Sequence, residues 1–450
     1  MKKFLISLIT ISSFILNGQE IKNDLVFEET ASLSGRGFSS LIYKNGEPRL
    51  MTIHKQGINI IDINSGKLIN SFELKGYHNK ELLGYSYTDE LLLFFKEDPL
   101  FEIILTVSKT NRVRKVPANA AISEDEIFLN SFTTNGQFYI LTITRKSSTL
   151  NLHSFKSFAL GEKKSYDLSE YFPSGSLFKE LKKRRGENAP PTLGGLPPAI
   201  TLVKDQFTSL YEISKLSKLY IDDASAIITL DNGLKTDLIQ LDLNSLKFSF
   251  KSLKSFTECT YSNSLIKNNA SNSMVNGNEI WMCKVCREAM HVSRSNLDGS
   301  NEVSWKYEID KDQGTSPVYT PIGAITKKKL KAISNRNVGV IAQKIGDEEL
   351  LLIGGYITKS APIPAPSGVV FFSVNYSDEE SVLLSGVRNM DNSDDRKFED
   401  NPFIKVNNEI KRMKENSHRY IYPFQIMNDI YISYYESSEK LFKIIKYKGY

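Results

Sequence analysis

The stretch GINIIDINSGKLINSFEL, residues 57–74, predicts the fold of this chain. Two short runs of β-forming residues flank the turn Asn64–Lys67, in which Gly66 can adopt the positive φ that tight hairpin turns require. The apolar residues of the two runs are Ile58, Ile60, Ile61, Ile63, Leu68, Phe72 and Leu74. In the second run they alternate with polar residues, which is typical of a hairpin with one buried face.

Residues 38–74 contain four such runs, separated by small turns. The runs are Phe38–Tyr43, Leu50–His54, Gly57–Ile63 and Leu68–Leu74. Four antiparallel strands in about 37 residues are typical of one blade of a β-propeller.

The same pattern continues along the chain. The next two sets of four are Leu83–Tyr87, Glu90–Phe95, Phe101–Val107 and Arg112–Val116, then Ile127–Phe132, Gln137–Thr144, Thr149–Phe155 and Lys163–Leu168. Later units are marked by their closing hairpins or strands, which are Asp237–Leu253, Met290–Ile309, Gly368–Val387 and Leu441–Tyr447. We therefore predict an all-β fold, a single propeller of seven four-stranded antiparallel blades, with six or eight blades as alternatives.

The lone strand Leu25–Phe27 has no hairpin partner of its own, whereas the last unit supplies three strands. We expect this strand to complete the last blade, because closing the ring removes exposed sheet edges. The alternative is that it belongs to a loose N-terminus.

Two segments resemble known propeller repeats. NLDGSN at Asn296–Asn301 resembles the turn of YWTD-type and TolB-like repeats, and IIDINSGKLINSFEL at Ile60–Leu74 is similar to repeats of surface-layer and quinoprotein-like propellers. These resemblances imply a secreted bacterial propeller fold and no particular activity. The tryptophan pattern of quinoprotein enzymes is absent, since the chain has only Trp281 and Trp305, so we expect no quinone cofactor.

Residues 1–19 are predicted to be a cleaved signal peptide, and residues 20–450 the propeller domain. Lys2 and Lys3 precede the apolar run Phe4–Leu16, which as a helix would rise about 20 Å, too short to span a bilayer core. The alternative is an uncleaved anchor. We expect an exported protein, periplasmic or extracellular, with no later transmembrane segment. The formal charge of +5 falls by two to +3 without Lys2 and Lys3, which is too small to indicate a nucleic-acid partner.

Three insertions interrupt the repeat, at about 169–198, 310–334 and 389–418. The first is predicted to begin with a helix, Ser176–Arg185, whose basic run Lys182–Arg185 could bind an anionic surface or simply face water. The second has helical spacing from Ala324 to Ile333, and the third is predicted to contain a helix at Val406–Asn416. Loops of this kind carry function more often than scaffold strands do.

The three cysteines are disulfide candidates. Cys283 and Cys286 form a CxxC pair in a strand-like segment, and Cys259 lies 24 residues before Cys283. Because residues i and i+3 of a strand point to opposite faces, we favour a bond from Cys259 to one of the two over Cys283–Cys286. Free thiols and metal or redox chemistry are the alternatives, but no second ligand pair has the spacing of a zinc site.

No catalytic or metal motif stands out. Asp310–Gly314 and Asp391–Asp400 could hold calcium but lack the complete EF-hand pattern, so solvated acidic loops are preferred. The five histidines, His54, His78, His153, His291 and His418, are scattered over separate units. We therefore predict no cofactor and no metal, and leave the catalytic residues unassigned.

The preferred hypothesis is an exported monomeric propeller that binds a protein or a surface polymer without catalysis. The alternative is a polysaccharide-active or other hydrolytic enzyme with two carboxyl groups ~5–10 Å apart at the central channel. The residues that line the channel distinguish the two hypotheses.

Overall fold

The structure of the protein, a computed structural model, describes residues 24–30, 38–96, 101–107, 109–110, 112–116, 122–156, 159–187, 199–203, 207, 210–222, 224–245, 247–254, 256, 271–286, 288–308, 320–321, 327, 330, 337–345, 348–362, 374–389, 402–427 and 429–447. The predicted signal peptide lies outside these residues.

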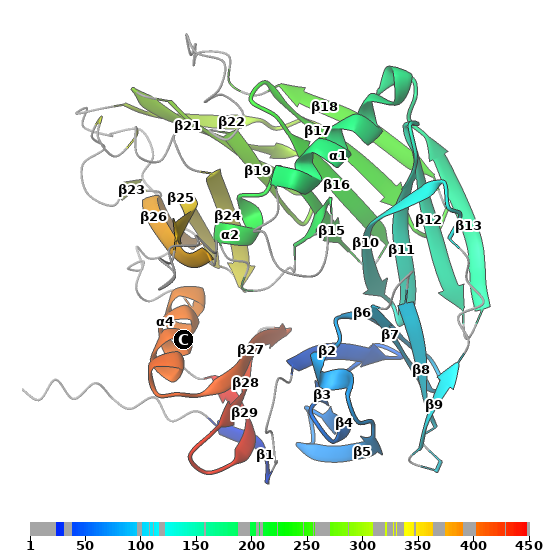
Figure 1. Cartoon of the computed structure of the whole chain (residues 1–450). Coiled ribbons are helices and arrows are strands. Elements are labelled where there is room, and N and C mark those ends of the chain that lie inside the picture. Colours follow the sequence, from blue (N-terminus) through cyan, green and yellow to red (C-terminus); the bar gives the residue numbers. More distant parts are fainter. Residues whose placement is uncertain are drawn as a thin grey trace, which may run out of the picture.

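The described strands form seven sheets arranged as blades around a central axis (Figure 1). The predicted propeller is therefore confirmed, with seven blades. The strands of blades 1 to 3 are β2 (Phe38–Lys44), β3 (Glu47–Ile53), β4 (Gly57–Asp62), β5 (Lys67–Glu73), β6 (Leu82–Tyr87), β7 (Leu91–Lys96), β8 (Phe101–Val107), β9 (Arg112–Val116), β10 (Glu126–Thr134), β11 (Gln137–Thr144), β12 (Thr149–Lys156) and β13 (Ala159–Asp167). Each blade is an antiparallel meander whose first strand lies nearest the axis.

Blades 4 and 5 follow the same plan, with one addition. Their strands are β14 (Thr201–Leu202), β15 (Ser217–Ile221), β16 (Ser225–Asp231), β17 (Lys235–Asp242), β18 (Phe248–Lys254), β19 (Ser271–Asn276), β20 (Glu279–Val285), β21 (Ala289–Asn296) and β22 (Val303–Glu308). The short strand β14 pairs in parallel with β15 on its channel side, so blade 4 has five strands.

Blade 6 differs from the prediction. Its strands are β23 (Thr320–Pro321), β24 (Asn337–Ile345), β25 (Glu348–Pro362) and β26 (Val374–Asn389), in the spatial order β23-β26-β25-β24. The expected closing hairpin at Gly368–Val387 is wrong, because residues 374–387 belong to one strand, β26, which pairs antiparallel with β25. The outermost strand, β23, precedes the innermost strand, β24, in the chain. The pairing of β23 with β26 joins segments far apart in the sequence, so no pattern among neighbouring residues predicts it.

Blade 7 closes the ring. Strands β27 (Arg419–Ile426), β28 (Asp429–Glu436) and β29 (Leu441–Tyr447) are completed by β1 (Asp24–Thr30), which pairs antiparallel with β29. The predicted closure by the N-terminal strand is confirmed. Phe27 is buried against Phe442, with ring centroids 6.5 Å apart, whereas Leu25 is 56% exposed.

The core lies between the blades rather than within them. Ile58 and Ile60 of β4 face blade 2, while Ile61 and Ile63 face blade 7, which explains an isoleucine-rich run without simple alternation. Across the turn, a bulge opposite Ile60 and Ile61 shifts the register of β5. Leu68 is therefore 41% exposed instead of lying on the buried face that the alternation predicts.

Gly66 is suited to its position for two reasons, the backbone conformation of the turn and the close approach of β1. Its φ of +61° confirms the predicted turn chemistry. A side chain there would also meet Val26 of β1, whose carbonyl oxygen lies 2.2 Å from the position of a Cβ atom. The turn of blade 1 thus packs directly on the strand that closes blade 7.

The helices that the structure describes are η1 (Tyr77–Asn79), η2 (Pro173–Gly175), α1 (Ser176–Glu187), α2 (Leu210–Ile213) and α4 (Pro402–Glu415). Of these, α2 lies inside the ring and the others lie between or beside the blades. The predicted helix Ser176–Arg185 is present as α1, and the predicted helix Val406–Asn416 begins earlier, at Pro402, a residue that suits the first turn of a helix. Most of Ala324–Ile333 lies outside the described residues.

Candidate functional site

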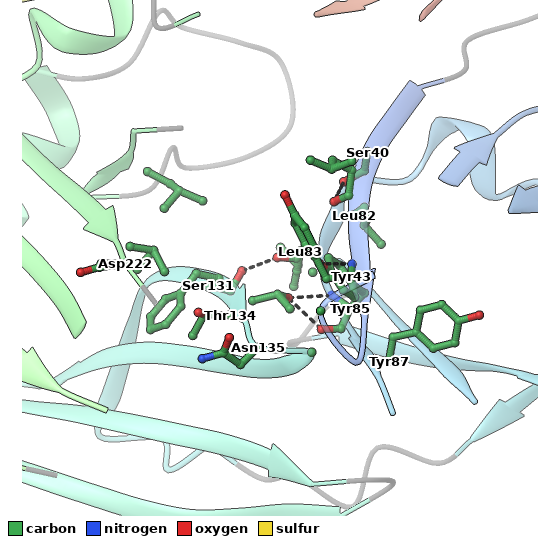
Figure 2. A pocket seen from close by; sticks show the side chains of 18 of the residues that line it. Ser40, Tyr43, Leu82, Leu83, Tyr85, Tyr87, Ser131, Thr134, Asn135 and Asp222 are labelled. Atoms are coloured by element: carbon green, nitrogen blue, oxygen red, sulfur yellow. Dashed lines mark hydrogen bonds between the residues drawn. The ribbon is translucent and has the colours of Figure 1, made fainter. Parts of the chain in front are cut away.

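The candidate functional site is a cavity of about 970 Å³ on the propeller axis, which we call the axial pocket. The innermost strands β27, β2, β6 and β10 of blades 7, 1, 2 and 3 form most of its wall, and the ends of β14 and β15 complete it. The turns that follow β2 and β6 also contribute, through Asn45 and Thr88. The turn after β10 contributes Asn135 (Figure 2). The pocket therefore opens where the innermost strands end.

The wall of the axial pocket is polar but carries little charge. Among the described residues that line it, Asp222 is the one with a carboxyl group. It lies exposed just after β15, and Figure 2 shows it across the pocket from Tyr43 of β2. The hydrolase hypothesis requires two carboxyl groups, and these lining residues supply only one.

Tyrosine hydroxyls satisfy the channel-facing edge of β2. The hydroxyl of Tyr422 in β27 accepts a hydrogen bond from the backbone N–H of Leu41 at 3.3 Å, and that of Tyr85 in β6 accepts one from Tyr43 at 3.1 Å. Burial raises the pKa of both Tyr85 and Tyr422 above the ordinary tyrosine value. Both phenol groups therefore keep their protons at neutral pH. Each hydroxyl can then act as a hydrogen-bond donor at the pocket wall.

The edge of β6 is satisfied by hydroxyls of β10. Thr133 Oγ1 donates to the carbonyl of Tyr85 at 2.8 Å and accepts from its N–H at 3.0 Å, and Ser131 Oγ donates to the carbonyl of Leu83 at 2.9 Å (Figure 2). An innermost strand is a sheet edge whose backbone groups need partners. Side chains of the neighbouring blade supply these partners here.

Blades 3 and 5 use the same Asn-Ser pair for this purpose. Asn130 in β10 donates from Nδ2 to the carbonyl of Ile200 at 2.8 Å and accepts from the N–H of Ser131. Asn272 in β19 likewise donates to the carbonyl of Val338 in β24 at 2.8 Å and accepts from the N–H of Ser273. These bonds join blade 3 to the residue that precedes β14 of blade 4, and blade 5 to the innermost strand of blade 6.

The channel on the side of blades 4 to 6 is filled by the chain itself. We call the described residues 199–203, 207 and 210–216 the plug. Ile200 packs between blades 3 and 4, Phe207 packs against blade 7 and α4, and Ile213 packs with residues of blades 5 and 6. Helix α2 lies inside the ring against β24 and β25 (Figure 1). The plug therefore crosses the channel, and Leu202 and Val203 form one wall of the axial pocket.

Buried polar side chains hold both ends of the plug. At its start, Ser217 Oγ donates to the carbonyl of Ala199 at 2.7 Å. At its end, Lys218 Nζ donates to the carbonyl of Lys215 at 2.8 Å, and Arg184 of α1 donates to the carbonyl of Leu216. We call the half of the channel at blades 4 to 6 the filled half and the half around the axial pocket the open half.

Lys218 is fully buried and forms an ion pair with Asp231 at 2.5 Å. Its Nζ also donates to Asn272 Oδ1 at 2.5 Å, and Asp231 accepts from Thr236 at 2.6 Å. Burial lowers the pKa of Lys218, and the Asp231 carboxylate opposes that shift. All three N–H donors of the Lys218 ammonium group have acceptors, so this ion pair has a structural role in the filled half. We call the Lys218–Asp231 pair the latch.

A second buried carboxylate lies in blade 3. Glu126 accepts hydrogen bonds from Lys163 at 2.5 Å, from His153 at 2.7 Å and from Thr142. Burial opposes ionisation, but these three bonds together hold the pKa of Glu126 below its usual value. Thr142 shares a face of β11 with Phe138, which stacks on Phe94 of blade 2, so the cluster lies between blades and away from the axial pocket.

Of the two cysteines that the structure describes, one is a free thiol and the other is disulfide-bonded. Cys283 is a buried free thiol, and Cys286 is disulfide-bonded. Cys259 lies outside the described residues. Cys283 pairs with Asn272 across β19 and β20, next to the Lys218 latch, and burial raises its thiol pKa to about 12. A thiol in this environment is unreactive.

The basic run of the first insertion does not act as a unit. Lys182 and Lys183 are exposed, whereas Arg184 is buried and bonded to the carbonyls of Leu216 and Asp231. The hypothesis of one anion-binding run is therefore wrong for Arg184, because helical periodicity turns it inward. The candidate calcium segments Asp310–Gly314 and Asp391–Asp400 lie outside the described residues.

The histidines do not converge on one site. His54 lies in the turn after β3, and His78 lies in η1 between blades 1 and 2. His153 binds Glu126, His291 packs on Phe256, and His418 Nδ1 bonds to the carbonyl of Met413 at the end of α4. Within the part of the chain that the structure describes, no three His, Cys, Asp or Glu side chains gather in a way that could hold a metal ion. In the same part, no helix has the length and apolar character needed to cross a membrane.

Sequence reasoning missed Tyr43, Tyr85, Tyr422 and Asp222. A weak signal existed, since tyrosines occur in the innermost strands of blades 1, 2 and 7. Aligning the first strand of each unit would have revealed this recurrence. The sequence could not show that these side chains lie around one pocket, because Tyr43 and Tyr422 are 379 positions apart in the chain.

Comparison with known proteins gives fold-level likeness only. The Dos1 propeller is 9% identical over 94% of this chain and 81% of that chain, with a TM-score of 0.35. Hsv2 of Kluyvelomyces marxianus is 7% identical over 94% and 98% of the two chains, with a TM-score of 0.34, and TolB of Acinetobacter baumannii is 12% identical over 61% and 55%, with a TM-score of 0.26. No protein-family model matches the sequence, and no curated protein matches it. The chain is a seven-bladed β-propeller because of its own seven sheets.

Proposed function

We propose that this protein is a non-enzymatic propeller that binds a protein or a surface polymer through its axial pocket. The observation that carries the proposal is the composition of the pocket wall, which combines hydroxyl, amide and aromatic groups with a single carboxyl group among its described residues. Such a wall can orient a ligand by hydrogen bonds and apolar contact. A hydrolase would need a second carboxyl group close to Asp222.

The plug supports the same proposal. Its apolar residues pack against blades 3 to 7, and Leu202 and Val203 form one wall of the axial pocket. A cavity with one wall made by an extra chain segment is suited to recognition, since loops placed on a rigid scaffold commonly bind partners.

We further propose that the protein is exported as a monomer after cleavage near Gly18 or Gln19. Lys2, Lys3 and the apolar run Phe4–Leu16 support this proposal. Mass spectrometry of the mature protein should show the loss of the first 18 or 19 residues, and light scattering should give the mass of one chain. A mature protein that retains Met1 would contradict export by this route.

Binding is tested with the mature protein and washed cell-envelope material from the producing cells. We expect the wild type to sediment with the envelope, and Tyr43→Ala and Asp222→Ala to reduce the bound fraction about tenfold. Tyr171→Ala is the matched control, because Tyr171 is as exposed (41%) as Tyr43 (37%) but stacks on Phe250 outside the pocket. Equal sedimentation of all four proteins would contradict the proposal.

A further inference from the structure

We propose that the ligand of the axial pocket is a neutral oligosaccharide. The inference rests on the proposed function and names the chemistry that the pocket recognises. Three properties of the pocket carry it: the balance of charge at its wall, the satisfied edges of its strands, and the kinds of group that line it.

The charge balance does not favour an ionic ligand. Asp222 is the one ionisable acid among the described lining residues, and two cations lie behind the opposite wall at Tyr87. Lys44 Nζ lies 4.9 Å from the centroid of the Tyr87 ring, and Arg49 donates to the Tyr87 hydroxyl at 2.9 Å. Recognition of a polyion requires a cluster of charges of one sign, and these groups oppose one another.

The strand edges do not favour an extended peptide. A peptide that adds to a sheet needs backbone N–H and C=O groups along an exposed edge. On β2 the N–H groups of Leu41 and Tyr43 already donate to tyrosine hydroxyls, and on β6 the backbone of Tyr85 already bonds to Thr133. These two of the strand edges that face the pocket are thus occupied along their middle.

The groups that the wall presents suit a sugar, which has hydroxyls at its edges and apolar C–H groups on its faces. Tyr43 exposes part of its ring, and Asp222 lies on the opposite side of the pocket (Figure 2). The hydroxyl of Tyr85 accepts the Tyr43 N–H, which leaves its own proton to donate to a ligand oxygen. The cavity volume of about 970 Å³ lies within the usual range for small-ligand sites, roughly 300–1,000 Å³.

Isothermal titration calorimetry with the full mature chain tests the inference. The probes are tri- and tetrasaccharides of glucose, galactose, mannose and N-acetylglucosamine, together with tri-lysine, tri-glutamate and oligogalacturonate as charged probes. We expect binding of at least one neutral oligosaccharide and of no charged probe. Tyr43→Ala and Asp222→Ala should weaken that binding about tenfold or more, and Tyr171→Ala should change it less than about twofold.

The outcomes separate the inference from the proposed function. If no neutral oligosaccharide binds while envelope binding still depends on Tyr43 and Asp222, the inference is wrong and the proposed function stands. If neither probe set nor envelope binds, both are wrong. If a bound oligosaccharide is cleaved, the ligand class stands and the non-enzymatic function is wrong. Asp222 is exposed beside a turn, so Asp222→Ala keeps the test decisive even where Tyr43→Ala fails to fold.

Discussion

The two halves of the channel solve the same packing problem in different ways. In the filled half, the plug covers the innermost strands, and buried charges such as Lys218 and Asp231 hold its ends. In the open half, hydroxyls of Tyr422, Tyr85 and Thr133 satisfy the strand edges and leave a cavity. Both halves satisfy the backbone of the innermost strands, but only hydroxyl caps do so without filling the space.

This difference separates stability from binding. A buried ion pair is costly to break, so the filled half should tolerate few changes. Each neutral hydrogen bond contributes less, so the open half can accommodate polar groups suited to a ligand. The following predictions test this division, beginning with the ring closure on which both halves depend.

The largest effect is expected from deleting residues 20–28, which removes most of β1. The lost ladder bonds contribute ~0.5–1.5 kcal/mol each, and burial of Phe27 contributes ~1.5–3 kcal/mol. Together these approach the whole stability of a domain, ~5–15 kcal/mol. We expect the truncated protein to unfold or aggregate, opening both halves. A melting temperature equal to that of the parent would contradict closure.

A matched pair of substitutions refines this test within β1. Phe27 is 9% exposed and Leu25 is 56% exposed, although both are apolar residues of the same strand. Phe27→Ser should lower the melting temperature clearly, and Leu25→Ser should leave it nearly unchanged.

In the filled half, Asp231→Ala should destabilise the protein by about 3–5 kcal/mol, because it leaves the buried Lys218 ammonium without its counter-ion. The midpoint of urea unfolding measures the loss. Adding Lys218→Met to the same chain should recover part of it, since the buried charge is then removed. Asp89→Ala, at an exposed position, is the control. Equal midpoints for Asp231→Ala and Asp89→Ala would show that the latch does not stabilise the plug.

Between blades 2 and 3, away from the axial pocket, Glu126→Gln should cost roughly 1–3 kcal/mol at neutral pH. The folded-state pKa of Glu126 is lowered, so its contribution is present above the ordinary carboxyl pKa and is lost as pH falls through the folded value. The wild type should therefore lose stability below about pH 5 more steeply than Glu126→Gln. Glu124→Gln, two residues away and exposed, should follow the wild-type curve. Parallel curves for all three would exclude a role for Glu126.

An effect of similar size is expected in the open half from Thr133→Val, which removes both hydrogen bonds to the Tyr85 backbone. We expect a loss of about 1–3 kcal/mol in urea unfolding, because the Tyr85 backbone groups lose their partner. Thr88→Val is the control, since Thr88 lines the same pocket but is exposed. If the two variants are equally stable, hydroxyl capping does not stabilise the open half.

A thiol titration tests the burial of Cys283 in the filled half and needs no substitution. Cys283 lies buried beside the latch, with its thiol pKa raised to about 12 by burial. Thiol titration of the native protein should therefore find no reactive sulfhydryl, and titration after denaturation without reductant should find one. Three thiols in the denatured protein would contradict the disulfide at Cys286.

The sequence by itself determined the local units. Alternation, small turns and Gly66 located the strands of the first three blades to within a few residues, because a strand and its hairpin turn depend on neighbouring residues. The lone strand at Leu25–Phe27 could be assigned to closure because an unpaired edge is costly. The bulge that exposes Leu68 was not predictable, since a single extra residue in the register leaves no compositional trace.

Only the tertiary structure decided what meets at the axis. Tyr43, Tyr85, Thr133, Asp222 and Tyr422 come from five different blades, and each position appears ordinary within its own strand. The outermost strand of blade 6, which comes from an earlier part of the chain, and the path of the plug were equally hidden, because they arise from pairing and packing between distant segments. Gly66 belongs to both levels: its positive φ follows from the turn sequence, whereas its contact with Val26 exists only because the chain ends meet and close the ring.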